Sequence, residues 1–285
     1  LNRRGHHVTV FEKDPLPGGL LTYGIPEMKL PKQIVARRIS LMEREGVSFR
    51  TSCHVGQQIS PEELAAQFDL VIFCCGAQQP RPLPFAETAG VFYALDYLRA
   101  SAQSLLEKTE PAVTASGRQV VLVGAGDSAS DCISVALRQG CRSITQLIRK
   151  PRTEQTEKRD HAHEEAEAVF GADIRRYETQ IERLVCGDDG SVNAVILQGS
   201  GEQLPCDLLL LASGFSGCEP ASVDAYEAVQ KTGVPALTAG DMASGVSLVV
   251  LAIASGKQAA AQADASLMGL SLIHISEPTR RRGIS

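Results

Sequence analysis

The sequence predicts an α/β protein in which one domain with a parallel sheet interrupts another. Three observations indicate this fold. Residues 119–151 read as strand, glycine turn, helix and strand. The first twelve residues read as the second half of the same pattern, and two similar buried strands that end in glycine, at 69–76 and 207–214, lie on either side of the central unit. Strands that alternate with helices are typical of parallel sheets, and the flanking repeats predict that the central domain is inserted into an outer one.

The central unit carries the strongest local signal. Apolar residues at 120–123 lead into Gly124, Gly126 and Ala129, a G-x-G-x-x-A turn that opens a helix, and a β-rich run follows at 143–148. The first glycine permits a tight turn, the second lets backbone N–H groups approach a pyrophosphate, and the small third residue lets the helix pack on the strand. The pattern therefore predicts a dinucleotide site at the positive end of the helix; the alternative is a purely structural turn.

Two cations, Arg149 and Lys150, follow the second strand of this unit. An acid there would accept hydrogen bonds from the ribose 2′-OH of NAD, whereas cations suit the 2′-phosphate of NADP. We therefore predict NADPH rather than NADH. The alternative is two solvated charges on a loop.

Composition excludes several classes of protein. The chain has 285 residues, 44% of them hydrophobic, a net charge of −5 and a pI near 5.7. It can bury a sizeable core, and it offers no basic field for nucleic acid or anionic lipid. Its longest apolar runs, such as 248–254, are too short to span a bilayer, and no signal-peptide pattern opens it. We expect a cytoplasmic protein.

Eight cysteines occur without a C-x-x-C pair. Cys74 and Cys75 are neighbours in an apolar run that is expected to be a strand, and we predict buried thiols because free cysteine packs as a small hydrophobe. A reductase of dithiols would need an exchange pair, and an iron–sulfur cluster would need clustered thiolates. This chain has neither.

The first twelve residues read as a helix end capped by Gly5, a strand at 8–11 and an acid, Glu12, at its tip. Glu12 would accept a ribose hydroxyl of an unphosphorylated adenosine, which suits FAD; the alternative is an ordinary surface acid. The matching glycine turn would lie roughly 20 residues upstream. We therefore expect the chain to be truncated at its front.

Further elements follow from periodicity and capping. Helices are expected at 33–45, after Ser60, at 93–108 and at 247–261, and a hairpin at 185–197. The expected core contacts of the helix at 33–45 are Ile34, Ile39, Leu41 and Met42.

Two polar features leave alternatives open. His161 and His163 would face different sides of a helix, so a solvated helix face is expected rather than a metal site. Asp241, after a short strand and before a helix, can hydrogen-bond the sugar-like chain of a flavin, or it can simply cap the helix.

Several stretches together resemble a known family. They are residues 12–26, the Gly124–Asp127 turn, Arg149 with Lys150, and 240–260. The likeness, over about residues 1–266, is to glutamate synthase small subunits and their relatives, which include the NADPH-reducing half of dihydropyrimidine dehydrogenase and ferredoxin–NADP reductase subunits. The G-G-L-L-x-Y-G-I-P loop and the closing helix are its specific parts, since many folds share the glycine turn.

The resemblance implies two nested Rossmann-like dinucleotide-binding domains. The FAD domain would occupy 1–80 and 215–268, and the inserted NADPH domain 81–214. Residues 269–285 would be a non-native or disordered tail, because Ser271–Ser285 resembles a translated sequencing-adapter read-through. The family's first glycine fingerprint and its cysteine-rich iron–sulfur region have no counterpart here.

The resemblance also implies site residues, none of them a catalytic side chain or a metal ligand. For FAD they are Glu12, Lys13, Gly19, Leu20, Lys29, Val55, Gly240, Asp241 and Leu248. For NADPH they are Gly124, Ala125, Gly126, Asp127, Arg149, Lys150, Lys158, Ala212, Ser213 and Gly214.

The implied activity is hydride transfer from NADPH to FAD. Electrons would then pass to iron–sulfur centres in the absent N-terminal region or on a partner subunit. One alternative is a thioredoxin-reductase-like disulfide reductase, which the missing C-x-x-C argues against. The other is a non-catalytic NADPH-binding remnant that cannot hold flavin.

Overall fold

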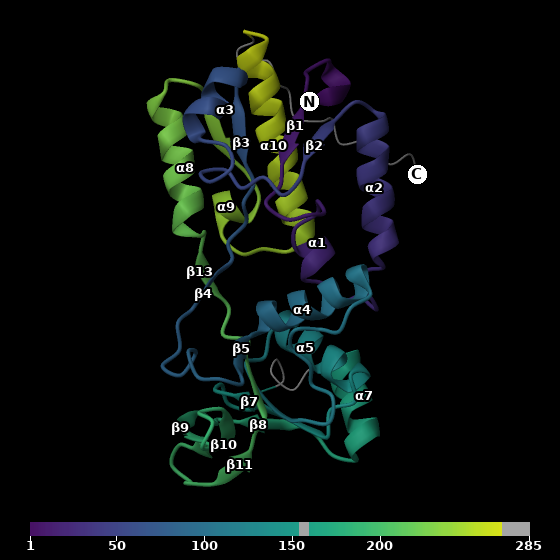
Figure 1. Ribbon diagram of the computed structural model, residues 1–285, viewed down its shortest axis with the longest axis vertical. Coiled ribbons are helices and arrows are strands. Elements are labelled where there is room, and N and C mark those ends of the chain that lie inside the picture. The colour runs from purple at the N-terminus through teal and green to yellow at the C-terminus, as the bar shows by residue number, and fades with distance from the viewer. Residues whose placement is uncertain (154–159, 270–285) are drawn as a thin grey trace, which may run out of the picture. The chain divides into compact units, whose positions relative to one another are not determined.

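The protein is described by a computed structural model that covers residues 1–153 and 160–269 (Figure 1). The chain divides into two units. Unit 1 contains residues 1–17, 38–79 and those from 215 onward, and unit 2 contains 18–37 and 80–214. The segment 18–37 thus groups with unit 2, although the expected boundaries place it in the outer domain. Lys158 and the tail beyond residue 269 lie outside the described residues.

Unit 2 is built on a sheet of five parallel strands. Their order is β5 (Val91–Tyr93), β12 (Leu208–Leu211), β6 (Gln119–Val123), β7 (Ser143–Ile148) and β8 (Arg175–Tyr177). The α/β class predicted from the sequence is confirmed.

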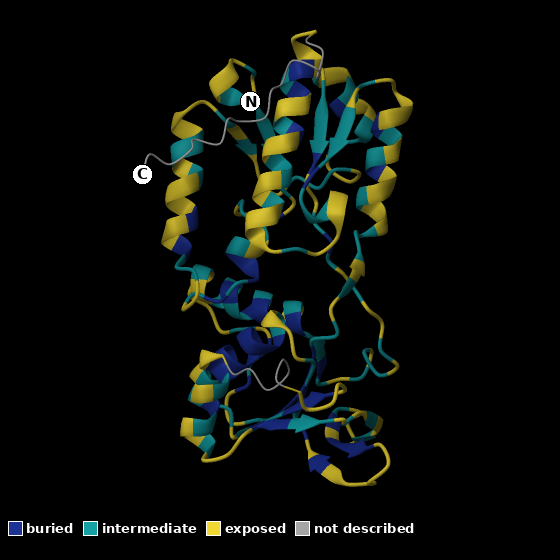
Figure 2. Cartoon of the chain, turned by 180° about the vertical axis from the view of Figure 1, so that it is seen from behind, coloured by how far each residue is buried: buried dark blue, intermediate teal, exposed yellow. Residues whose placement is uncertain are grey.

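The two faces of this sheet are covered differently. Leu122 packs with the helices α4 (Ala94–Glu107), α5 (Asp127–Arg138) and α7 (His161–Phe170). Its neighbour Val121 packs on the other side, with the antiparallel strands β9 (Ile181–Cys186), β10 (Val192–Leu197) and β11 (Gln203–Pro205). Side chains alternate across a strand, so the predicted hairpin covers one face of the sheet. The sheet is accordingly dark blue in Figure 2.

Unit 1 contains two separate pairs of parallel strands. They are β1 (Thr9–Phe11) with β2 (Ser48–Arg50), and β3 (Val71–Phe73) with β14 (Ala236–Thr238). Its helical elements are η1 (Asn2–Arg4), α3 (Pro61–Gln67), α8 (Pro220–Lys231), α9 (Asp241–Ser244) and α10 (Val249–Leu267). A small core forms around Phe73, Ala225 and Val229.

The remaining elements are short, apart from α2. Helix α1 (Leu20–Tyr23) follows the glycine pair, and α2 (Lys32–Arg44) follows it in turn. Strands β4 (Gln79–Pro80) and β13 (Phe215–Gly217) pair where the chain passes between the units. No helix among the described residues is long and apolar enough to cross a bilayer.

The structure confirms the expected start of one helix and contradicts part of the expected buried face of another. Ser60 forms the predicted cap of α3, with a reciprocal capping box to Glu63. The predicted face of α2 is wrong at Ile34, whose exposed fraction is 55%, while Lys32 and Val35 are buried. Lys32 turns inward because its amine donates to the carbonyl oxygens of Leu21 and Ile25.

The prediction that the thiols are buried is wrong for three cysteines. Cys74, Cys75 and Cys186 are exposed, whereas Cys132 and Cys206 are buried. Strand β3 ends at Phe73, so the first two follow the strand instead of lying within it. The prediction from apolar neighbours in the sequence therefore overestimated the length of this strand.

Candidate functional site

Three predicted segments meet at one edge of the parallel sheet of unit 2. They are 124–127, 149–150 and 212–214, which follow β6, β7 and β12 in the centre of the sheet. Backbone bonds join the ends of these strands: the Gly124 N–H donates to the Leu147 oxygen at 3.1 Å, and the Ala212 N–H donates to the Val123 oxygen at 2.8 Å. Ligands of open α/β sheets bind at such carboxyl ends.

Gly124 is required by the fold. Its φ is +127°, and a Cβ built there would overlap the carbonyl oxygen of Ala212. A left-handed φ and a close backbone approach each favour glycine. The first glycine therefore fixes the tight exit from β6, as its place in the motif predicts.

Gly126 is not required by the fold. Its φ of −92° and ψ of −177° suit any residue, and nothing lies within 4 Å of a Cβ built there. Among the glycines in the described part of the chain, only Gly126 and Gly256 lack both a positive φ and a neighbour at that distance. The space in front of Gly126 is open, and a phosphate group can approach the backbone there.

The start of α5 offers hydrogen-bond donors to that space. No side chain caps this helix, and Ala125, Gly126 and Asp127 are exposed. The first N–H groups of a helix have no partner within it and carry partial positive charge. Arg149 and Lys150 are exposed at the end of the adjacent strand β7. This edge therefore combines free N–H groups with two cations.

A chain of hydrogen bonds supports the glycine turn from behind. Gln146 on β7, with an exposed fraction of 1%, donates from Nε2 to the Gly124 oxygen at 2.8 Å. Its Oε1 lies 2.9 Å from His163 Nε2, and His163 Nδ1 lies 2.7 Å from Asp160 Oδ1. Asp160 also caps α7, where it accepts the His163 N–H. The chain thus links the start of α7 to the turn.

The solvated helix face predicted for the two histidines is therefore wrong for His163. Its side chain is only 10% exposed, whereas that of His161 is 82% exposed. No group of side chains suited to a metal ion occurs among the described residues. Sequence analysis also missed Gln146, whose only signal was a polar residue inside the apolar run at 143–148.

In unit 1, Glu12 lies where the sequence placed it, at the end of β1. It is half-buried, and burial raises its pKa, an effect that the Asp14 N–H partly offsets by donating to Oε1 at 3.0 Å. The peptide N–H of Cys53 donates to the backbone carbonyl oxygen of Glu12 at 2.9 Å. This bond brings the segment that contains Val55 beside Glu12. A half-buried carboxylate of this kind can accept a ribose hydroxyl.

The residues around α9 form a local cap. Asp241 Oδ1 accepts the Ser247 hydroxyl at 2.6 Å and the Ser247 N–H at 3.1 Å, and the Gly240 N–H donates to Ser255 at 2.9 Å. Leu248 is the N-cap of α10 and is 61% exposed. Apolar side chains from Val246 to Ile253 are also exposed, and α10 is mostly yellow in Figure 2.

Two cations implied as flavin contacts already hold partners. Lys13 pairs with Glu219 at 3.2 Å in unit 1. Lys29 pairs with Asp131 of α5 at 2.5 Å in unit 2. Gly19 and Leu20, at the start of α1, also belong to unit 2, so the implied flavin residues are divided between the two units.

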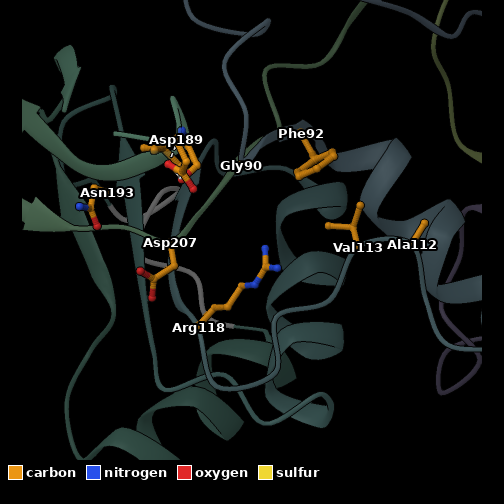
Figure 3. Close-up of a pocket in the computed structure, with 10 residues that line it drawn as sticks. Gly90, Phe92, Ala112, Val113, Arg118, Asp189, Asn193 and Asp207 are labelled. Carbon is orange, nitrogen blue, oxygen red and sulfur yellow. Dashed lines mark hydrogen bonds between the residues drawn. The ribbon is translucent and has the colours of Figure 1, made fainter. Parts of the chain in front are cut away.

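A pocket of about 430 Å³ lies at the opposite edge of the parallel sheet (Figure 3). Gly90, Arg118 and Asp207, which directly precede β5, β6 and β12, contribute to its lining. None of the predicted site residues is among the described residues that line it. The pocket is therefore separate from the edge that carries the glycine turn.

Comparison with known proteins places the chain among related sequences. The family model described as pyridine nucleotide-disulphide oxidoreductase matches residues 1–256. The glutamate synthase [NADPH] small chain of Bacillus subtilis is 36% identical, over 96% of this chain and 65% of its own length. The glutamate synthase [NADH] of Schizosaccharomyces pombe is 32% identical, over 94% of this chain and 15% of its own length. The chain thus spans less than two thirds of either relative.

Among solved structures, Mycobacterium tuberculosis FprA in complex with NADPH is similar in fold. Its TM-score is 0.61 at 17% identity, and the match covers 95% of this chain and 80% of FprA.

Proposed function

Because the chain belongs to the pyridine nucleotide-disulphide oxidoreductase family, we propose that it is an NADPH-dependent FAD oxidoreductase resembling glutamate synthase small chains. In this proposal unit 2 binds NADPH, and a hydride passes from the nicotinamide to the flavin. FAD supplies the redox chemistry when bound, because it accepts a hydride and can release electrons singly. The protein's own residues bind and orient the two coenzymes.

One observation supports the proposal most strongly: the space in front of Gly126. This glycine meets no steric or conformational need of the fold, it opens an uncapped helix, and two cations lie at the end of the next strand. Residues 212–214 would close the other side of the site, since Ala212 lies against Gly124. An anionic dinucleotide with a 2′-phosphate satisfies all of these features.

FAD suits residues of unit 1 in two respects. Glu12 offers a half-buried acceptor for a ribose hydroxyl, and the exposed apolar run from Val246 to Ile253 offers a surface against which a flavin ring can pack. Glu12, Lys13, Val55, Gly240, Asp241 and Leu248 are the proposed contacts there. Gly19, Leu20 and Lys29 are the proposed contacts from unit 2.

Electrons would then pass from the flavin to iron–sulfur centres. These centres would lie on a separate subunit or on another region of a longer chain. A disulfide reductase is the weaker candidate, because the sequence contains no C-x-x-C. A cytoplasmic location stays a prediction of the sequence.

The cation proposal is tested by exchanging Arg149 and Lys150 together for glutamine. Calorimetry would compare the dissociation constants of NADP⁺ and NAD⁺ for the parent and variant chains. Loss of charge-assisted hydrogen bonds to a phosphate should weaken NADP⁺ binding about 10- to 100-fold and leave NAD⁺ binding unchanged. The absorbance of the purified protein separates the enzyme, which carries flavin, from a colourless NADPH-binding remnant.

Arg142→Gln is the matched control. Arg142 is an exposed cation of the same segment, but it precedes β7 instead of following it. It should leave both dissociation constants unchanged. A parent chain that binds NAD⁺ as tightly as NADP⁺, or a control that behaves like the double variant, would overturn the assignment.

A further inference from the structure

The walls of the pocket in Figure 3 carry charges of both signs. Arg118, directly before β6, supplies a cation, and Asp189, in the turn between β9 and β10, supplies an anion. A second acid, Asp207, directly precedes β12. Within the described part of the chain, neither carboxylate forms an ion pair with Arg118, and the guanidinium has no other partner. Its N–H groups are therefore free to bind an anionic group.

The backbone at Arg118 is held in place. Its N–H donates to the Ala115 oxygen at 3.0 Å, and its oxygen accepts the Arg142 N–H at 2.8 Å. The next residue, Gln119, donates its N–H to Asp207 Oδ2 at 2.9 Å. These bonds fix the bases of two charged side chains before any ligand binds, and a preformed site loses less entropy on binding.

The wall that carries Asp189 is also fixed to the sheet. The Val192 N–H donates to the Ala89 oxygen at 2.8 Å. Gly90 has a φ of +83°, and a Cβ built on it would lie 2.9 Å from Val192 Cγ1. Glycine at this position therefore lets the hairpin approach β5 closely.

Asp189 keeps one carboxylate oxygen for a ligand. The Ser191 hydroxyl at 2.6 Å and the Ser191 N–H at 3.0 Å both donate to Oδ1, which leaves Oδ2 without a hydrogen bond from the described residues. The same bonds from Ser191 lower the pKa of Asp189. The side chain is therefore anionic at neutral pH.

The balance of charge selects the kind of ligand. One arginine and two aspartates, a single positive charge against two negative ones, give the pocket a net charge of −1. This net charge disfavours a simple anion, and a simple cation would leave Arg118 without a partner. A molecule that carries both an anionic and a cationic group can bind Arg118 and an acid together.

Apolar side chains line another part of the pocket. Val113 is 9% exposed and belongs to the main core of unit 2, and Phe92 packs against that core. In Figure 3 both lie on the side of Arg118 opposite Asp207. The pocket volume of about 430 Å³ falls within the roughly 300–1,000 Å³ of small-molecule sites. A small zwitterion with an apolar side chain therefore matches both the charges and the apolar wall.

We propose that this pocket binds a free α-amino acid with an apolar side chain. Arg118 donates to the α-carboxylate, Asp189 accepts from the α-ammonium group, and Phe92 and Val113 contact the side chain. The pocket is separate from the glycine turn, so the inference does not rest on the proposed coenzyme binding.

The probes that test it are L-leucine and its two analogues with a single charge, 3-methylbutylamine and 4-methylpentanoate. Calorimetry at pH 7 should give the parent chain a dissociation constant below about 1 mM for leucine. Each analogue should bind at least about tenfold more weakly, because it lacks one charge-assisted hydrogen bond. Leucine binding up to about 10 mM that is absent, or no tighter than that of either analogue, would overturn the proposal.

Two variants assign the contacts. Arg118→Gln and Asp189→Asn should each weaken leucine binding about tenfold. Leucine should lose its advantage over 3-methylbutylamine in Arg118→Gln, and its advantage over 4-methylpentanoate in Asp189→Asn. An advantage that persists in either variant would contradict the role given to that residue.

Arg142→Gln and Asp188→Asn are the matched controls. Arg142 is bonded to Arg118 through the backbone, Asp188 precedes Asp189, and both are exposed without lining the pocket. Both controls should bind leucine like the parent, and weakening as large as in the pocket variants would overturn the assignment. Urea denaturation checks that all four variants fold; if a pocket variant does not, the comparison of leucine with its analogues on the parent chain decides.

Discussion

A Cβ on Gly124 would overlap the carbonyl oxygen of Ala212 at the end of the neighbouring strand. The close approach of these two residues thus fixes the backbone of the chain where it leaves β6 and β12. Gly126, two positions later, faces open space. Under the proposed function, the two glycines of this motif have different tasks, the first in folding and the second in binding, and mutation can separate the two.

Gly124→Ala should destabilise the protein. The methyl group would overlap Ala212, and the φ of +127° is unfavourable for alanine. Strain of this kind costs about 1–3 kcal/mol, and the overlap adds to it, so we expect the free energy of unfolding to fall by at least about 2 kcal/mol. Urea denaturation measures this. An unchanged midpoint would show that the strands can separate at this point without cost.

Gly126→Ala should leave the fold intact and impair binding. Its backbone suits alanine, and a substitution at a compatible site stabilises by about 0.4–1 kcal/mol through the unfolded chain. The methyl group would occupy the space proposed for the pyrophosphate, so NADP⁺ should bind at least tenfold more weakly. Calorimetry and urea denaturation on the same preparation check both parts. Normal NADP⁺ binding by this variant would place the phosphates elsewhere.

Thiol reactivity should follow local burial. Cys186 is exposed. Cys74 is exposed over the whole residue, but burial around its thiol raises the pKa to about 11. Burial also raises the pKa of Cys132 and Cys206. Because the thiolate is the reactive form, a chromogenic disulfide reagent should modify Cys186 first, Cys74 more slowly, and the two buried thiols only after unfolding.

Cys186→Ser provides the control for the labelling experiment. It should remove the fastest phase and leave the others unchanged. Rapid labelling of Cys132 in the native protein would show that α5 opens on the timescale of the reaction.

The sequence predicted those features that short patterns determine. Strand β7 was expected at 143–148 and occurs there, and the Ser60 capping box follows from four consecutive residues. The family resemblance, and not strand periodicity, implied Gly124 and Ala212 as contacts of one coenzyme; the structure brings them together because β6 and β12 are parallel neighbours whose carboxyl ends share an edge.

Features that depend on distant partners were not predictable in this way. Lys32 is buried because the carbonyl oxygens of Leu21 and Ile25 surround its amine, and periodicity alone ranks a lysine as exposed. His163 is buried because its two ring nitrogens have hydrogen-bond partners in Gln146 and Asp160. Such contacts join separate elements, and no single-sequence pattern encodes them.

An ion pair with a defined pH dependence joins α5 to α7, the helix that carries His163. Arg138 donates to both carboxylate oxygens of Glu165, at 2.9 and 3.0 Å. The hydrogen bond from Arg138 lowers the pKa of Glu165 below its ordinary value of 4.5. A group whose pKa is lower in the folded state stabilises the protein above the unfolded value, and this contribution is lost as pH falls through the folded pKa.

Glu165→Gln should therefore reduce the free energy of unfolding at pH 7 but not at pH 3 or below. The pair is partly exposed, with 27% of the Glu165 side chain accessible, so we expect a loss of only about 0.5 kcal/mol. Urea denaturation at both pH values measures it. Glu164→Gln is the control, because the Glu164 carboxylate is 66% exposed and has His161 as its partner at 3.8 Å. A loss that persists unchanged at low pH would show that the side chain of Glu165 acts through packing and not through its charge.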